Sequence, residues 1–178
     1  MTTTPAPVSA DALRACMRQF PTGVALLTVG RAEATIGMTV NSFTSVSLDP
    51  PLVLVCVHRR ARVARAVAVG DALTISFLGA DQSWLVRRFA SRARPDGHAA
   101  VAEMDGCAGT NGVPAPGQAL GVLECVLDRS IPIGDHVLLI GLVVHATTRS
   151  DRAPQVFYRG ELTTVPPAVH TREETHDE

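Results

Sequence analysis

The chain has 178 residues, of which 46% are hydrophobic, and its formal net charge is −1 at neutral pH. A chain of this length is expected to form one domain with a sizeable core. The apolar content and the near-neutral charge argue against intrinsic disorder and against bulk binding to nucleic acid, so we expect no nucleic-acid partner. All sixteen basic residues are arginine, and any anion site must therefore use guanidinium groups.

The cysteines and the apolar runs bear on the cellular compartment. Four widely spaced cysteines form no CxxC pair, and the sequence shows no signal peptide. The longest apolar runs are too short or too interrupted to span a bilayer. These features predict a cytoplasmic protein with reduced thiols and no membrane association.

The predicted elements, in chain order, are mostly strands. Residues 1–8 are expected to form a flexible tail, and Ser9 is a plausible N-cap for a helix to about residue 19. Further short helices are predicted at 60–69 and at 80–90, where Trp84, Leu85 and Phe89 form an apolar stripe. Strands are predicted at 23–29, 34–40, 43–47, 52–57, 72–78, 120–128, 136–148 and 156–165. This pattern favours a mainly β barrel over a doubly wound sheet.

Two segments depart from the strand pattern. Residues 91–117 are rich in glycine, alanine, proline and arginine with weak periodicity. They are predicted to form an irregular insert within a single domain that spans residues 9–165. Residues 166–178 are acidic and polar and are expected to form a flexible C-terminal tail.

The stretch from Thr39 to Val57 combines a polar first part with an apolar second part. Hydroxyl and amide side chains crowd the first part, and Asp49-Pro50-Pro51 then forces a corner because proline fixes φ and cannot donate to a ladder. Neutral polar groups of this kind suit a ligand that is polar along one edge and flat and apolar elsewhere. A β-arch built from ordinary strand and turn formers explains the same pattern, and both interpretations stay open.

Signatures of other site chemistries are missing. No GxGxxG follows a strand, and the sequence contains no HExxH, no metal-spaced Cys/His set and no GxSxG elbow. We therefore expect no bound metal and no protein nucleophile. Structural proteins also lack these motifs, so their absence does not by itself identify an enzyme.

Three motifs together resemble the flavin reductase family, the FMN-binding split-barrel proteins that supply reduced flavin to two-component monooxygenases. They are Phe20-Pro21-Thr22-Gly23-Val24-Ala25, the run from Gly37 to Ser47 with Asp49-Pro50-Pro51-Leu52, and Gly134-Asp135-His136. Together they extend from about Leu13 to Tyr158 in the family's order. The resemblance implies a mainly β, FMN-binding split β-barrel of Greek-key type with a few short flanking helices, assembled as a homodimer.

The resemblance also implies an activity. The protein would be an NAD(P)H:flavin oxidoreductase that passes hydride from the nicotinamide to flavin N5 and supplies reduced flavin to a partner monooxygenase. Its cofactor would be FMN, with FAD possible, and its co-substrate NADH or NADPH. Two alternatives stay open: a flavin-binding split-barrel module without reductase activity, and a flavoenzyme of the same fold that acts on an organic substrate.

Individual residues receive roles from the same resemblance. His136 is the implied catalytic residue, beside the nicotinamide, with Asp135 fixing its tautomer. The loop after Val57 carries arginines where the family has small hydroxyl residues, and guanidinium groups suit a phosphate; Arg60 is the strongest candidate there. The full cofactor-binding set is Thr39, Val40, Asn41, Ser42, Ser45, Val46, Ser47, His58, Arg59, Arg60, Arg62, Arg88 and Asp135.

Overall fold

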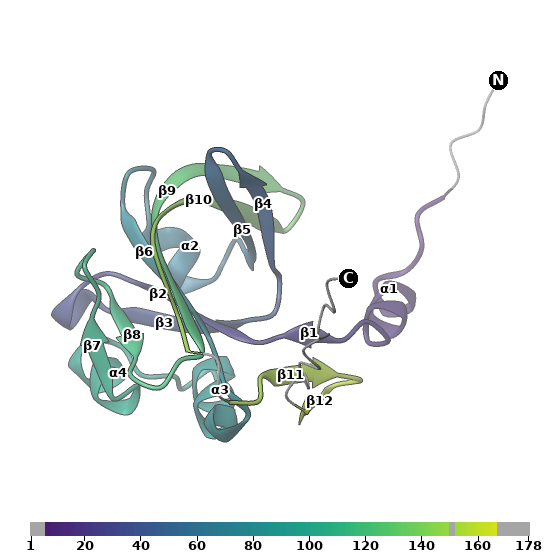
Figure 1. Ribbon diagram of the computed structural model, residues 1–178. Helices are drawn as coiled ribbons and strands as arrows, with labels where there is room; N and C mark the ends of the chain where they lie inside the picture. Colours follow the sequence, from purple (N-terminus) through teal and green to yellow (C-terminus); the bar gives the residue numbers. More distant parts are fainter. Residues whose placement is uncertain (1–5, 150–151, 167–178) are drawn as a thin grey trace, which may run out of the picture.

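A seven-stranded antiparallel sheet forms the centre of the protein in a computed structural model that describes residues 6–149 and 152–166. The strand order is β3-β2-β6-β9-β10-β5-β4, and the sheet curls around its own core (Figure 1). Its strands are β2 Ala25–Val29, β3 Ile36–Val40, β4 Phe43–Leu48, β5 Pro51–His58, β6 Ala72–Phe77, β9 Gly121–Ile133 and β10 His136–Thr148. The mainly β split barrel predicted from the sequence is confirmed.

The barrel is split between its two edge strands. The edges β3 and β4 are consecutive in the chain, and only Asn41 and Ser42 join them. Ser42 is fixed to β5 by two hydrogen bonds: its Oγ donates to the carbonyl oxygen of Cys56 at 2.5 Å, and its own carbonyl oxygen accepts from the Cys56 N–H at 3.0 Å. The polar stretch of the sequence therefore crosses the opening of the barrel.

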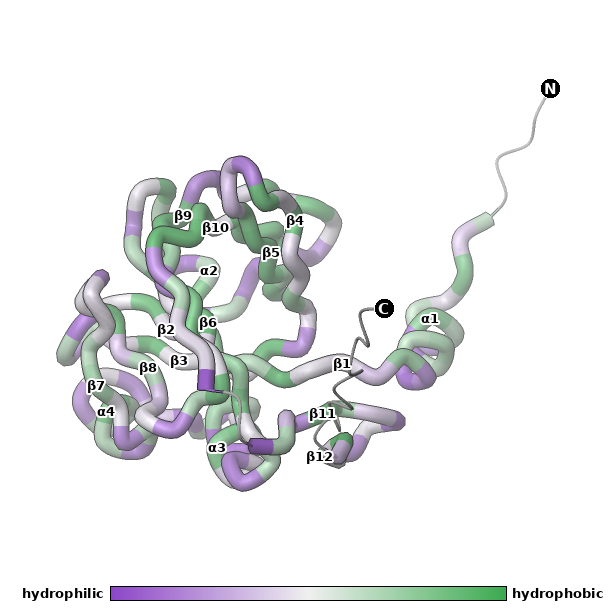
Figure 2. Tube along the Cα trace, in the orientation of Figure 1, coloured by the Kyte–Doolittle hydropathy of each residue, from purple (hydrophilic) through white to green (hydrophobic). Residues whose placement is uncertain are grey.

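Two apolar clusters hold the sheet, one on each of its faces. Successive side chains of a strand point to opposite faces, and β2 is buried along its whole length. Leu27 and Val29 pack in the cluster inside the barrel, whereas Leu26 packs with Leu85 and Phe89 of the helix that covers the outer face. Figure 2 shows the hydrophobic segments along the strands.

The helices are short, and one of them packs against the cluster inside the barrel through Val63. They are α1 Ala10–Met17, α2 Arg62–Ala66, α3 Ser83–Ala90 and α4 Gly97–Glu103, with 3-10 turns η1 Ala32–Ala34 and η2 Ala80–Gln82. Ser9 caps α1, because its Oγ accepts a hydrogen bond from the Ala12 N–H at 3.2 Å, as predicted. Helix α2 ends well before residue 69 since Val67 is extended. Helix α1 buries none of its residues and stands away from the barrel (Figure 1).

Two details of helix α3 differ from the prediction. Leu85 and Phe89 are buried, but Trp84 is 54% exposed, so it does not belong to the apolar stripe. Val86 takes its place on the buried face.

Gly37 of β3 lies directly under helix α3: a Cβ there would approach Phe89 Cε1 to 2.6 Å. The close approach of α3 to the sheet therefore depends on a glycine at this position.

The predicted irregular insert at 91–117 is wrong for much of its length. It contains α4 and a two-stranded sheet, β7 Gly106–Ala108 with β8 Pro114–Pro116. The buried Glu124 carboxylate anchors the connecting loop, accepting from the Thr110 N–H and Oγ1 at 3.1 and 2.6 Å and from the Asn111 N–H at 2.7 Å. Burial raises the pKa of this carboxyl, but these hydrogen bonds outweigh burial and leave the pKa lowered.

The C-terminal part also differs from the prediction. The single strand expected at 156–165 is a hairpin of β11 Gln155–Tyr158 and β12 Glu161–Thr164, and it pairs with β1 Thr22–Gly23 in a separate three-stranded sheet. The strand predicted at 23–29 is accordingly divided into β1 and β2. Most of each predicted tail, 1–8 and 166–178, lies outside the described residues.

Substitution of Phe89 tests the packing of α3 on the sheet. We predict that Phe89→Ala lowers the free energy of unfolding by about 3–5 kcal/mol, because it opens a cavity between α3, β2 and β3. Trp84→Ala on the same helix is the matched control and is expected to cost less than about 1 kcal/mol. Urea unfolding of both variants measures the difference, and equal losses would contradict the observed orientation of the helix.

Candidate active site

The pairing of β5 with β10 brings two histidines together. His58 at the end of β5 lies opposite His136 at the start of β10, and their ring centroids are 5.4 Å apart in an edge-to-face arrangement. The Arg59 N–H donates to the carbonyl oxygen of Asp135 at 3.0 Å, which holds the β9–β10 turn against the end of β5. Gly134 makes this turn possible with its φ of 56°.

A hydrogen bond fixes the tautomer of His136. Its Nδ1 lies 2.7 Å from Asp135 Oδ1. This hydrogen bond is the main cause that lowers the pKa of the Asp135 carboxyl, so the carboxylate is ionised at neutral pH and accepts the bond. The Nδ1 atom therefore carries the proton, and Nε2 remains available to a ligand. His58 has the opposite arrangement, because its Nδ1 accepts the Arg60 N–H at 3.0 Å.

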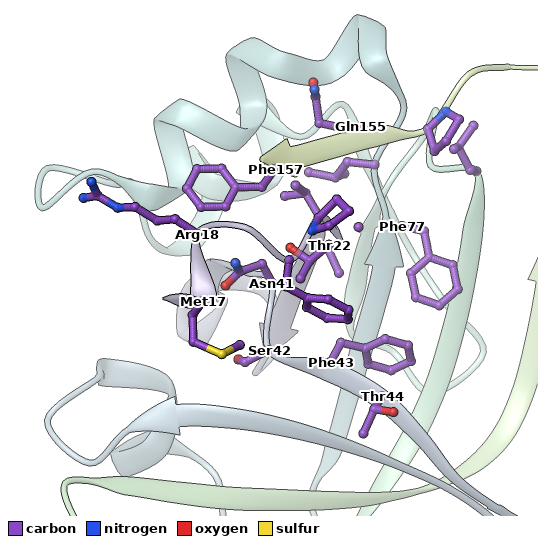
Figure 3. A pocket seen from close by; sticks show the side chains of 18 of the residues that line it. Met17, Arg18, Thr22, Asn41, Ser42, Phe43, Thr44, Phe77, Gln155 and Phe157 are labelled. Carbon is purple, nitrogen blue, oxygen red and sulfur yellow. The ribbon is translucent and has the colours of Figure 1, made fainter. Parts of the chain in front are cut away.

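His136 lines a large cleft at the split of the barrel. The cleft has a volume of about 1190 Å³ and mostly apolar walls, with aromatic side chains from separate elements: Phe20, Phe43, Phe77 and Phe157. The rings of Phe43 and Phe77 pack at 5.2 Å with an interplanar angle of 59°. Figure 3 shows Thr22, Asn41 and Ser42 between the aromatic side chains. The arrangement offers flat apolar surfaces with a few neutral polar groups.

The residues of the stretch from Thr39 to Ser47 fall into two groups, those that line the cleft and those that do not. Asn41, Ser42 and Thr44 line the cleft. Thr39 does not line it, since its Oγ1 donates to the carbonyl oxygen of Val86 at 2.8 Å, and Val40 is buried in the core. Ser45, Val46 and Ser47 lie further along β4, where a bulge interrupts the pairing with β5. Within the predicted flavin-contacting stretch, the cleft is therefore lined only by residues 41–44, which lie at the split of the barrel.

The candidate arginines differ in what they already bind. Arg62 Nη1 donates to Asp96 Oδ2 at 2.5 Å, and Arg88 makes a two-pronged pair with Glu103 at 2.6 and 2.8 Å. The pKa of Arg88 is raised and that of Glu103 lowered, both mainly by this hydrogen-bonded pair. Arg59 and Arg60 are exposed, and neither pairs with an acidic side chain within residues 6–149 and 152–166.

Comparisons with known proteins identify the family of the chain. The family described as "Flavin reductase like domain" matches residues 17–166. The chain is 40% identical over 154 residues to the NADH-dependent FMN reductase AsuE2 of Streptomyces nodosus subsp. asukaensis, an alignment that covers 85% of this chain and 83% of that protein. This chain belongs to the flavin reductase-like family.

Solved structures of this family agree with the fold. BorF, the flavin reductase component of a bacterial two-component tryptophan halogenase, matches with a TM-score of 0.80 and 36% identity over 89% of this chain and 99% of that chain. The NADH:FAD oxidoreductase SgcE6 of Streptomyces globisporus C-1027, in complex with NAD and FAD fragments, matches with a TM-score of 0.81 and 34% identity over 92% of this chain and 99% of that chain.

The cleft fits the ring systems that a flavin reductase must hold. Single-ligand pockets commonly measure about 300–1,000 Å³, and this cleft, at about 1190 Å³, exceeds that range. Thr22 lies in its wall, and Thr22 Oγ1 is shielded from solvent with no hydrogen-bond partner among the described residues. A buried hydroxyl without a partner is unfavourable, so a polar ligand edge at this wall would satisfy it.

Most of the apolar lining of the cleft was not predicted from the sequence. Phe77 and Met17 come from two separate elements, and nothing in their local sequence marks them as lining residues. Phe20 and Phe43 lay within the motifs that carried the resemblance, but neither received a role. Within the described residues, no cluster of His, Cys, Asp or Glu could hold a metal ion.

Arg60 pairs with no acidic side chain of the described residues, whereas Arg88 pairs with Glu103, and this difference leads to a prediction about the flavin phosphate. We predict that Arg60→Ala weakens FMN binding by about 1.5–3 kcal/mol through loss of a charge-assisted hydrogen bond. Riboflavin, which lacks the phosphate, should bind as before. Fluorescence titration of both flavins measures the two affinities.

Arg88→Ala is the matched control in this experiment. Because Arg88 is held by Glu103 and by the carbonyl oxygen of Ala93, we expect it to change the affinities for FMN and riboflavin equally. A selective loss of FMN affinity in Arg88→Ala, with none in Arg60→Ala, would reassign the phosphate to the loop after α3.

Proposed function

We propose that this protein is an NAD(P)H-dependent flavin reductase that supplies reduced flavin to a partner monooxygenase. One observation carries the proposal: the split of the barrel places neutral polar groups, aromatic walls and a histidine of fixed tautomer around one cleft. The relatives include NADH-dependent reductases of both FMN and FAD. FMN, with FAD as a second possibility, is therefore the proposed flavin, and NADH or NADPH the proposed hydride donor.

The protein's part in the reaction is to bind, orient and exclude water. When bound, the flavin supplies N5 as the hydride acceptor, and the nicotinamide C4–H bond supplies the hydride. Asn41, Ser42 and Thr44 offer neutral donors and acceptors at one wall, while Phe43 and Phe157 provide apolar surfaces for flat rings. No side chain has to act as a nucleophile, because the flavin carries the electron chemistry.

His136 is proposed to orient the dinucleotide. Its Nδ1–H is held by Asp135, so its Nε2 presents a hydrogen-bonding atom in a fixed direction at the cleft wall. Hydride transfer depends steeply on the distance and alignment of donor and acceptor, and a fixed side chain at this wall limits the positions that a nicotinamide can take. Asp135 acts through His136 and is a positioning residue.

A partner and a location complete the proposal. BorF is a component of a two-component tryptophan halogenase, and another similar structure is component B of nitrilotriacetate monooxygenase from Mycobacterium thermoresistibile. We propose a flavin-dependent monooxygenase as the acceptor of reduced flavin. We propose a cytoplasmic location, which is supported by four free cysteines. No helix of the described residues is long and apolar enough to cross a membrane.

Consumption of the hydride donor tests the function directly. Purified protein should oxidise NADH or NADPH only when FMN, FAD or riboflavin is added, and far faster than the same mixture without protein. Each flavin and each nicotinamide is tested in turn, which also measures both preferences. Flavin binding without oxidation of either nicotinamide would indicate the carrier module. Oxidation only in the presence of an organic acceptor would indicate the alternative flavoenzyme.

We also propose that the protein is a homodimer. Apolar side chains are exposed on the edge strand β4 and along β9 and β10, and Leu48 is 89% exposed. An edge strand with unpaired backbone groups and exposed apolar side chains is a common site of association. We predict a dimer in analytical ultracentrifugation at micromolar concentration, shifted toward monomer by Leu48→Asp. A monomeric wild-type protein would contradict this proposal.

A further inference from the structure

Three arginines stand at the margin of the cleft, apart from the loop after β5. Arg14 and Arg18 come from α1 and the residue after it, and Arg159 comes from the turn between β11 and β12. All three line the cleft and all three are exposed. Figure 3 shows Arg18 at the edge of the cleft, extending outward beyond Met17 and Phe157. These arginines form the arginine rim.

Backbone and side-chain hydrogen bonds hold the two halves of the rim together. The Arg159 N–H donates to the carbonyl oxygen of Arg18 at 3.1 Å, and Arg159 Nε donates to Gln19 Oε1 at 3.0 Å. Segments that are 140 residues apart in the sequence are therefore joined at this margin. The backbones of Arg18 and Arg159 are therefore tied together, and both residues line the same margin of the cleft.

The rim retains unused hydrogen-bonding capacity. In the described parts of the chain, Arg18 and Arg159 pair with no acidic side chain. Arg14 pairs with Asp11 at 2.8 Å, but both side chains are exposed, and such pairs are weak. An anion that binds near both arginines is attracted by each of the two positive charges, and its binding also relieves their mutual repulsion. The rim is therefore suited to a ligand with more than one negative charge.

The backbone at Arg159 is also unusual. Arg159 has a φ of 53° and Gly160 a φ of 92°, so both central residues of the hairpin turn have positive φ. Two-residue turns of this kind favour Asn-Gly or Asp-Gly, and arginine is disfavoured at the first position. An arginine in a place that suits asparagine better points to a use for its charge.

We infer that Arg18 and Arg159, assisted by Arg14, bind the diphosphate of the nicotinamide dinucleotide while its nicotinamide ring lies in the cleft near His136. The inference rests on the proposed reductase function, which requires two anionic ligands. The flavin phosphate has a separate candidate in Arg60, which does not line the cleft. The arginine rim lines the same cleft as His136, and it supplies positive charges separate from that of Arg60. It thus discriminates hydride donors with phosphates from donors without them.

The test compares two hydride donors. NADH carries the diphosphate, and dihydronicotinamide riboside carries the same ring and ribose without phosphate. In the double variant Arg18→Gln, Arg159→Asn, the asparagine suits the positive φ of the turn and so preserves the hairpin. We expect the KM for NADH to rise about tenfold with little change in kcat, because two exposed charge-assisted contacts are lost. The kinetics with dihydronicotinamide riboside and the KM values for FMN and riboflavin should stay unchanged.

A control and a salt series sharpen the test. Arg87→Gln removes an exposed arginine of α3 that does not line the cleft, and it should leave both donors unaffected. Added salt should raise the KM for NADH in the wild type more than in the double variant, since screening weakens only charged contacts.

Each other outcome overturns the inference. Equal losses with both donors would show that the rim only shapes the cleft, and a selective rise in the KM for FMN would assign it to the flavin phosphate. Unchanged kinetics in the double variant would leave the rim without a ligand. Failure of the proposed function looks different, because the wild type would then oxidise neither donor in the presence of flavin.

Discussion

The antiparallel pairing of β5 with β10 is the constraint on which the site depends. Its register places His136 opposite His58 and holds the β9–β10 turn through the bond from Arg59 to Asp135. The same strand β5 fixes Ser42 through two hydrogen bonds to Cys56. One strand therefore positions both the histidine and the polar wall of the cleft. A one-residue slip of this register would turn His136 to the other face of the sheet.

Local sequence signals predicted much of this arrangement. Ser9 as a helix cap, the two prolines at the start of β5 and the turn at Gly134 and Asp135 each have a physical signature within a few residues, and each appears in the structure. Alternation of apolar and polar residues located most strands. The pairing that curls them into a split barrel was not visible in the periodicity, and it entered only through the resemblance to a family.

The errors arose where distant partners decide what a residue does. Thr39 faces α3 because a carbonyl oxygen of that helix accepts its hydrogen bond, and Arg88 is held by Glu103 of α4. The segment at 91–117 has weak periodicity, yet the buried Glu124 carboxylate organises its loop from a strand that follows it in the chain. No local pattern reports such partners, so sequence reasoning could not separate occupied polar side chains from free ones.

We propose that His136, held by Asp135, positions the hydride donor in the cleft. Stopped-flow reduction of the protein-bound flavin by NADH tests it most directly, with wild type and His136→Ala compared. We predict a fall of about tenfold or more in the rate of reduction, with flavin affinity, thermal stability and reduction by dithionite unchanged. An unchanged rate with NADH would contradict the claim, and loss of flavin or of the fold would assign His136 to the structure of the barrel.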